Sequence, residues 1–191
     1  MSNRVYLMRH GEKQNGDHVN LSLAGLSRSV HLVEYFRENF PGDLPTKIYA
    51  MKQADKNHSN RSYQTVAPLA QQLELTINSD YLKEDAVALA KDILKLFKSS
   101  KESEVILVCF EHDELPAIAR TLINTNSIKG WNPKNYKDKT LDLYNFMWIV
   151  DFNESSIKLS TMSTFDVNKK NGLVDTSNLT AKNIITPVIF K

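Results

Sequence analysis

Residues 5–11 read VYLMRHG, an apolar run that ends abruptly in an arginine, a histidine and a glycine. The run Val5–Met8 predicts a short buried strand. In open α/β sheets, ligands bind just beyond the carboxyl ends of the strands. At that point Arg9 supplies a fixed cation, His10 an imidazole that can attack or carry a proton, and Gly11 a residue without a side chain. This trio suits an anion that is held and then attacked, and phosphate is the obvious candidate.

The composition is that of an ordinary globular protein. The chain has 191 residues, enough for one well-buried domain, with 41% hydrophobic and 24% charged residues. Its net charge of +2 provides no broad field for nucleic acid or for an anionic membrane surface. The single cysteine, Cys109, excludes an intramolecular disulfide and lies in an apolar run, where an inert buried thiol is expected. We therefore expect a single domain over residues 1–191.

The beginning of the chain and its hydropathy bear on location. The sequence starts MSNR and runs straight into the first predicted strand, so no secretory signal peptide is indicated. No apolar stretch approaches the ~18 residues that a membrane-spanning helix needs. These observations predict a cytoplasmic location, with neither a membrane nor nucleic acid as a partner.

Strands and helices alternate along the chain as far as residue 122. Apolar runs predict strands at 47–50, 75–77 and 104–110, and helical periodicity predicts helices at 23–40, 64–73, 83–98 and 115–122. Ser22 or Asn20 can cap the first helix, whose apolar residues recur at helical spacing: Leu23, Leu26, Val30, Val33 and either Phe36 or Leu32. Residues 146–152 and 157–162 resemble paired strands. The alternation favours an α/β fold with a mostly parallel central sheet and helices on both faces.

Two further segments bring candidate anion ligands to the ends of predicted elements. Arg61 comes just before a predicted helix, where free backbone N–H groups and its guanidinium fork suit phosphate oxygens. A plain surface arginine is the alternative. His112 follows the strongest predicted strand and is flanked by Glu111 and Asp113. If that strand and the first one are neighbours, His10 and His112 face each other across one pocket.

The order of these segments resembles a known family. The matching stretches are LMRHGE at 7–12, NLSLAG at 20–25 and RSYQT at 61–65, followed by His112. Together they are similar to the histidine phosphatase superfamily, the phosphoglycerate mutase-like group, over residues 4–122. This resemblance implies the fold of that group and a phosphatase activity that needs no metal and no other cofactor. The short chain fits a compact phosphatase better than a mutase.

The chain also departs from the family pattern. It has Met51-Lys52-Gln53 where the family often has a Ser-Pro pair shortly before the second arginine. It has Asp113 where the mutase branch frequently has a glycine after the second histidine. The first difference weakens the inference about substrate more than the inference about chemistry, because the Ser-Pro pair is largely architectural.

The resemblance implies roles for four residues. His10 is the implied nucleophile, which attacks phosphorus as a neutral imidazole and becomes phosphohistidine. Its other ring nitrogen should then donate to a nearby carbonyl and so fix the tautomer. Arg9, Arg61 and His112 are implied to hold the phosphoryl oxygens and to stabilise their charge.

The glycine and the carboxylates nearby have further expected roles. Gly11 is expected to let the chain turn close to the bound anion. Glu12 begins a predicted pocket-wall loop and Glu111 can pair with an arginine, so both are substrate-binding candidates. The leaving alkoxide also needs a proton from a carboxylic acid. Glu84 resembles the acid of the mutase-like branch and Asp113 that of the acid phosphatase and phytase branch. Glu111 is a third candidate for this acid, and Asp113 is slightly preferred.

Three functions follow from this reading. The leading interpretation is a metal-independent phosphomonoesterase that acts on a small phosphorylated substrate. The second is a catalytically silent module of the same fold that binds a phosphate group, and the third is an α/β domain that binds another anionic metabolite. The segment 124–142 is predicted to form part of the pocket wall, and Trp131, Tyr136 and Tyr144 are candidates to stack on a substrate. The substrate and the oligomeric state are left open.

Overall fold

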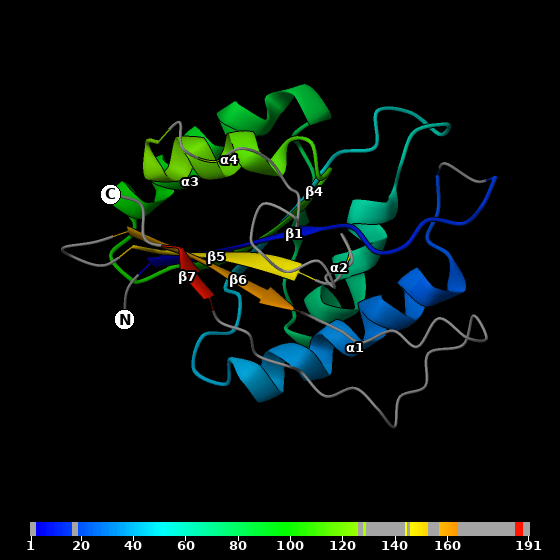
Figure 1. The fold of residues 1–191 in the computed structure, drawn as a ribbon, viewed down its shortest axis with the longest axis horizontal. Helices are drawn as coiled ribbons and strands as arrows, with labels where there is room; N and C mark the ends of the chain where they lie inside the picture. The colour runs from blue at the N-terminus through cyan, green and yellow to red at the C-terminus, as the bar shows by residue number, and fades with distance from the viewer. Residues whose placement is uncertain are drawn as a thin grey trace.

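One mixed sheet forms the centre of the molecule. The computed structural model describes residues 3–16, 19–125, 128, 144, 146–152, 157–163 and 186–188. Within these residues, seven strands lie in the order β3-β2-β4-β1-β5-β6-β7 (Figure 1). Their bounds are β1 (Asn3–Arg9), β2 (Lys47–Ala50), β3 (Ile77–Asn78), β4 (Val105–Phe110), β5 (Phe146–Phe152), β6 (Ile157–Ser163) and β7 (Thr186–Val188).

The half of the sheet that comes first in the chain is parallel. β3, β2, β4 and β1 pair in parallel, whereas β5, β6 and β7 add antiparallel neighbours beside β1. Five of these strands therefore run one way, and β5 and β7 run the other. Parallel neighbours need long crossover connections, which helices provide here. The predicted mostly parallel α/β sheet is confirmed, and so is the pairing of 146–152 with the strand that follows it.

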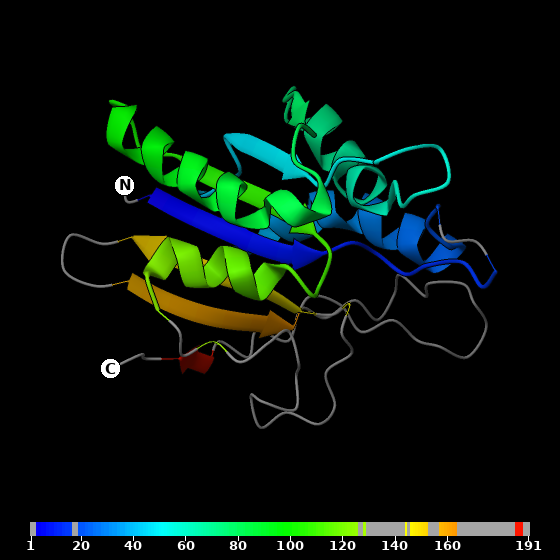
Figure 2. The same ribbon diagram turned by 90° about the horizontal axis from the view of Figure 1, so that it is seen from above.

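Helices cover both faces of the sheet. One face carries α1 (Leu23–Asn39) and α2 (Arg61–Gln72). The other carries α3 (Ala86–Ser99), which follows the 3₁₀ turn η1 (Lys83–Asp85), and α4 (Leu115–Ile123). The two layers lie above and below the strands in Figure 1, and Figure 2 shows α3 and α4 in front of the sheet. The predicted helices on both faces are thus present.

The central strands divide their side chains between the two layers. On β1, Tyr6 and Met8 pack with α1 and α2, whereas Val5 and Leu7 pack with α3 and α4. This division follows from the two-residue period of a strand. β4 is buried at all of its positions, as expected for a strand that is covered on both faces. The core therefore fixes β1 and β4 most firmly, and their carboxyl ends lie at the same edge of the sheet.

The first helix lies where it was predicted, but the face that it buries differs from the predicted one. Ser22 caps α1 by accepting a hydrogen bond from the Gly25 N–H at 3.2 Å, as expected. Of the predicted apolar stripe, however, Leu23, Leu26 and Val30 are exposed, with Leu23 at 72%. The buried face consists of Gly25, Arg28, Ser29, Leu32, Tyr35 and Phe36. The prediction was wrong there because the amino-terminal half of α1 packs against the loop after β1 through small and polar residues.

Other boundaries differ from the predicted ones by a few residues. The strand predicted at 47–50 has those bounds, and β4 begins one residue later than predicted. α2 starts at Arg61 and not at residue 64, so Arg61 lies inside the first helical turn. The helix predicted at 83–98 divides into η1 and α3. The change at Arg61 matters for function, because it attaches that side chain to a rigid element.

Part of the predicted pocket wall lies outside the described residues. Of segment 124–142, only Asn124, Thr125 and Ile128 are described, so Trp131 and Tyr136 are not. None of the described helices combines the length and the apolar character that crossing a membrane requires. The cytoplasmic location stays a prediction.

Candidate active site

The candidate site lies at the carboxyl ends of β1 and β4. These strands are parallel neighbours, with Arg9 opposite Phe110, so His10 and Glu111 leave the sheet side by side. The strands that precede His10 and His112 are therefore neighbours, which was the condition for the two histidines to share one pocket. α2 packs against β4 and begins with Arg61, whose side chain contacts Glu111. Three segments that are distant in the sequence thus meet at one edge of the sheet.

His10 is held in a defined state by the backbone. Its side chain is 1% exposed, and its Nδ1 lies 2.7 Å from the carbonyl oxygen of Gly11. A carbonyl only accepts hydrogen bonds, so Nδ1 carries a proton and donates it. In a neutral imidazole this leaves the lone pair on Nε2. The sequence analysis expected such a contact for a nucleophilic histidine.

Two arginines flank His10. The Arg61 side chain is nearly buried, and its Nη2 lies 3.5 Å from Oε1 of Glu111. The Arg9 guanidinium stacks on the ring of Tyr144, with Cζ 4.2 Å from the ring centroid. That ring also lies 6.1 Å from the His10 ring, centroid to centroid. Tyr144 therefore packs against Arg9, a contact that orients a cation by its attraction to an aromatic face.

Buried nitrogens at this edge lack hydrogen-bond partners among the described residues. They are Nε of Arg9, Nε2 of His10 and Nδ1 of His112. A buried polar group without a partner costs about 1–3 kcal/mol, so such groups are rare unless a ligand or water completes them. Three nitrogens around one strand edge can donate to, or attack, an anion. Such a grouping suits an anionic ligand.

His112 is more open than His10. Its side chain is 30% exposed, with Nε2 3.0 Å from Oδ1 of Asp113 and Nδ1 3.7 Å from Oε2 of Glu111. Burial lowers the pKa of His112, and the charge of Arg9 lowers it further, while the two carboxylates raise it. The net direction is downward. Arg9 and His10 both contribute to this lowering.

Glu111 lies in the middle of the cluster. Its side chain is 15% exposed, and Oε1 is 3.5 Å from both Nε2 of His10 and Nη2 of Arg61. Burial alone would raise the pKa of Glu111. The nearby His10, followed by the positive charges of Arg61 and Lys83, outweighs burial and lowers that pKa to about 2. Glu111 is therefore an anion in contact with Arg61, one of the residues that were predicted to hold a phosphoryl group.

The three candidate acids occupy different environments. Asp113 is 60% exposed and lies between His112 and Lys83, whose Nζ is 3.6 Å from Oδ2. Glu84 is exposed on η1 and forms no hydrogen bond or ion pair within the described residues. Its neighbour Lys83 contacts Asp113, so η1 lies beside the loop between β4 and α4. Of the three, Glu111 alone is largely buried.

The loop after β1 is held by contacts that the sequence analysis missed. The carboxylate of Glu12 binds the buried guanidinium of Arg28 through both oxygens, with one N–O distance of 2.9 Å. Gly25 lies so close that a Cβ there would fall 2.5 Å from the Glu12 carbonyl oxygen. This pairing supports the loop, and a role for Glu12 in substrate binding stays a prediction. The signal for this ion pair is the burial of Arg28 on α1. The sequence does not show that burial.

Two consecutive buried hydrogen bonds connect the residues after β1 to α2. The Gly11 N–H donates to Oγ1 of Thr65 at 2.8 Å, and that hydroxyl donates to the carbonyl of Arg61 at 2.8 Å. Thr65 lies within the matching stretch RSYQT, but its role was not foreseen. A Cβ at Gly11 would lie 3.1 Å from Cα of Gly25, so the backbone passes closely there. The position of His10 relative to Arg61 is thereby fixed through hydrogen bonds.

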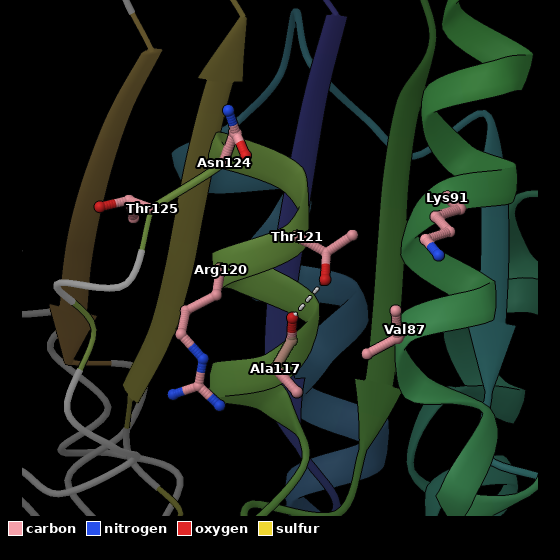
Figure 3. Close-up of a pocket in the computed structure, with 7 residues that line it drawn as sticks. All are labelled: Val87, Lys91, Ala117, Arg120, Thr121, Asn124 and Thr125. Carbon is pink, nitrogen blue, oxygen red and sulfur yellow. Dashed lines mark hydrogen bonds between the residues drawn. The ribbon is translucent and has the colours of Figure 1, made fainter.

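The described residues also form pockets away from this cluster. A pocket between α3 and α4, drawn in Figure 3, is lined by Val87, Lys91, Ala117, Arg120, Thr121, Asn124 and Thr125. Two of its polar side chains bind the protein: Arg120 donates to the Ile128 carbonyl, and Thr121 to the Ala117 carbonyl. Within the described part of the chain, no group of three or more histidine, cysteine, aspartate or glutamate side chains could hold a metal ion. Cys109 is buried in β4, and burial raises the pKa of its thiol.

Comparison with known proteins bears on the fold. Neither a protein-family model nor the sequence of a curated protein matches the chain. Among solved structures, the protein histidine phosphatase SixA with tungstate is similar, with a TM-score of 0.57 and 17% identity over 84% of this chain and 96% of SixA. A mycobacterial glucosyl-3-phosphoglycerate phosphatase has a TM-score of 0.55 and 14% identity, over 85% of this chain and 98% of its own.

A third similar structure is the phosphoserine phosphatase of Entamoeba histolytica with 3-phosphoglyceric acid. Its TM-score is 0.51 at 14% identity, over 82% of this chain and 94% of its own. These similarities extend over most of each chain and confirm the resemblance found in the sequence. The protein has the phosphoglycerate mutase-like α/β fold that these structures share.

Proposed function

We propose that the protein is a metal-independent phosphomonoesterase that works through a phosphohistidine on His10. The observation that carries this proposal is the state of His10. It is buried, its Nδ1 donates to the Gly11 carbonyl, and its Nε2 has no hydrogen-bond partner among the described residues. A neutral imidazole in this state presents a lone pair beside two arginines, which is what an in-line attack on phosphorus needs.

The proposed reaction has two steps. The Nε2 lone pair forms a bond to phosphorus while the ester P–O bond breaks, and the departing oxygen takes a proton from a carboxylic acid. Water then attacks phosphorus and gives one proton to the carboxylate, which restores the acid, while the P–N bond breaks and inorganic phosphate leaves with His10 neutral again. Arg9, Arg61 and His112 would hold the phosphoryl oxygens and stabilise the charge that develops on them.

Asp113 is our proposed proton donor. It lies next to His112, at 3.0 Å, and on the exposed side of the cluster, where the alcohol part of a substrate has room to extend. Glu111 suits this role less well in the free protein because its pKa is lowered to about 2 and it is ionised at ordinary pH. Glu84 remains the alternative, on the neighbouring turn η1.

A small phosphorylated molecule is the proposed substrate. Two of the similar structures are of phosphatases named for glucosyl-3-phosphoglycerate and phosphoserine, and they support this class without identifying its member. The anion cluster, with its buried nitrogens, accounts for the phosphate end of such a molecule.

A catalytically silent phosphate-binding module is the second candidate function. One observation favours it: Asp113 and Glu84 are both exposed, and the one buried carboxyl group beside His10 within the described residues is ionised. Such a protein would still bind phosphate but would lack an acid for the leaving group.

The test is hydrolysis of p-nitrophenyl phosphate in the presence of a chelator, from acid to neutral pH. We expect wild-type activity, loss of activity in His10→Ala, and retention in His58→Ala, a matched control at an exposed histidine. An acid-labile phosphoryl group on wild-type protein but not on His10→Ala would identify the intermediate. If His10→Ala keeps its activity, the proposed mechanism is wrong. If wild type binds phosphate but hydrolyses nothing, the binding module is supported.

A further inference from the structure

The carboxylate of Glu111 has spare capacity to accept hydrogen bonds. Its contacts with the neighbouring cations and histidines among the described residues are long: 3.5 Å to Arg61, 3.5 Å to His10 and 3.7 Å to His112. Charge-assisted N–H···O bonds are normally about 2.7–2.9 Å long, and an ionised carboxylate offers about four lone-pair sites. Glu111 is thus only loosely bound by its cationic neighbours and can accept further donors.

The groups around Glu111 come from every element that meets there. They are His10 at the end of β1, Arg61 on α2, Lys83 on η1, and His112 in the loop before α4, with Arg9 acting on His112. These neighbours keep Glu111 ionised, since they lower its pKa to about 2. At ordinary pH a negative charge on Glu111 therefore lies among the positive charges of Arg9, Arg61 and Lys83.

A fixed carboxylate distinguishes between oxyanions by their protons. An oxyanion with a P–OH group can donate a hydrogen bond to the carboxylate, while its other oxygens accept from the arginines. A fully ionised oxyanion such as sulfate has no proton to donate, so its oxygens face the carboxylate and are repelled. Leaving a buried charged group without its partner costs more than the bond itself contributes.

We propose that Glu111 is a specificity-determining residue that accepts a hydrogen bond from a protonated phosphoryl oxygen and so excludes fully ionised oxyanions from the site. This inference rests on the proposed function in one respect, that the cluster around His10 binds the phosphoryl group. It adds the protonation state of the ligand: one proton lies between Glu111 and the bound group. Substrates would accordingly be bound as the monoanion of a phosphate monoester, which dominates below a second pKa of about 6.

Calorimetric titration with inorganic phosphate and with sulfate, at about pH 6 where phosphate carries protons, tests the proposal. We expect wild-type protein to bind phosphate at least about tenfold more tightly than sulfate, the effect of one hydrogen bond to a charged group. In Glu111→Gln the preference should fall severalfold, because sulfate gains affinity when the negative charge is removed. The amide still accepts from P–OH, so phosphate binding should persist. Glu102→Gln, at an exposed glutamate remote from the site, is the matched control.

The outcomes separate this inference from the proposed function. If wild type binds sulfate as tightly as phosphate, or if Glu111→Gln leaves the ratio unchanged, Glu111 does not select the protonated group, although the phosphate site itself stands. If wild type binds neither anion, both the inference and the proposed function are wrong. The wild-type preference is measured without any variant. Equal binding of phosphate and sulfate by wild type therefore overturns the inference even if Glu111→Gln fails to fold.

Discussion

The ends of β1 and β4 each place a histidine just past a buried strand, yet the two histidines have different surroundings. His10 is 1% exposed and its Nδ1 is held by a backbone carbonyl at 2.7 Å. His112 is 30% exposed and lies between the carboxylates of Asp113 and Glu111. A carbonyl fixes one tautomer and adds no full charge. At His112 the two carboxylates raise the pKa, but burial and the charge of Arg9 lower it more. The strand register places His10 level with Glu111 and not with His112, so the two histidines differ in position as well as in surroundings. The corresponding tasks in our proposal are attack for His10 and donation for His112.

The largest expected effect separates these two tasks. His10→Ala should lower kcat/KM for p-nitrophenyl phosphate by at least about 10⁴-fold, because the covalent intermediate cannot form. His112→Ala should lower it by only about 10²–10³-fold, the usual effect of removing one donor to a developing negative charge. Steady-state kinetics of both variants check this order. Equal losses, or a greater loss at His112, would contradict the assignment of nucleophile and donor.

The next prediction concerns what holds the loop at the end of β1. Glu12→Gln should lower the free energy of unfolding by about 3 kcal/mol, because it leaves the Arg28 guanidinium, 1% exposed, without its carboxylate. Urea unfolding measures the change. Glu34→Gln, at an exposed position on the same helix as Arg28, is the control and should change stability little. Similar stability of the two variants would show that the Glu12–Arg28 pair does not support the loop.

At the end of β4, acid should reveal the cationic surroundings of Glu111. Burial raises its pKa, but His10, Arg61 and Lys83 lower it more, from 4.5 to about 2. Because the pKa is lower in the folded state, the contribution to stability is complete above pH 4.5 and is lost as the pH falls toward 2. Between about pH 6 and pH 3, wild type should lose about 2 kcal/mol more than Glu111→Gln in urea unfolding. Parallel losses in the two proteins would contradict this.

The smallest expected effect tests the link between β1 and α2. Thr65→Val should destabilise the protein by about 1–2 kcal/mol, because the Gly11 N–H loses its buried acceptor. Thr121→Val removes a hydroxyl that only donates to a carbonyl within α4, so it should cost less. Urea unfolding compares the two variants. If Thr65→Val lowers the catalytic rate by more than its loss of stability explains, the link also positions His10. If the two variants lose equal stability, the Gly11–Thr65 hydrogen bond does not stabilise the protein as predicted.

Much of the fold was predictable from local patterns. β1, β2, β4 and β5 coincide with apolar runs, and the alternation of strands and helices indicated a mostly parallel sheet. The face of α1 was not predictable. Leu23, Leu26 and Val30 are more apolar than Gly25, Arg28 and Ser29, yet the second set is buried because the loop after β1 must approach the helix closely. Apolar periodicity cannot detect a face that is buried through a glycine and an ion pair.

For the candidate site, the sequence by itself determined which residues stand at the ends of the strands. Arg9, His10 and His112 follow apolar runs, and that order is a property of the chain. Only the tertiary structure decided how their environments differ: the carbonyl at His10, the burial of Glu111, and the exposure of Asp113. Burial and the pKa of a carboxylate depend on charges brought together from β1, β4, α2 and η1, and no single segment of sequence contains that information.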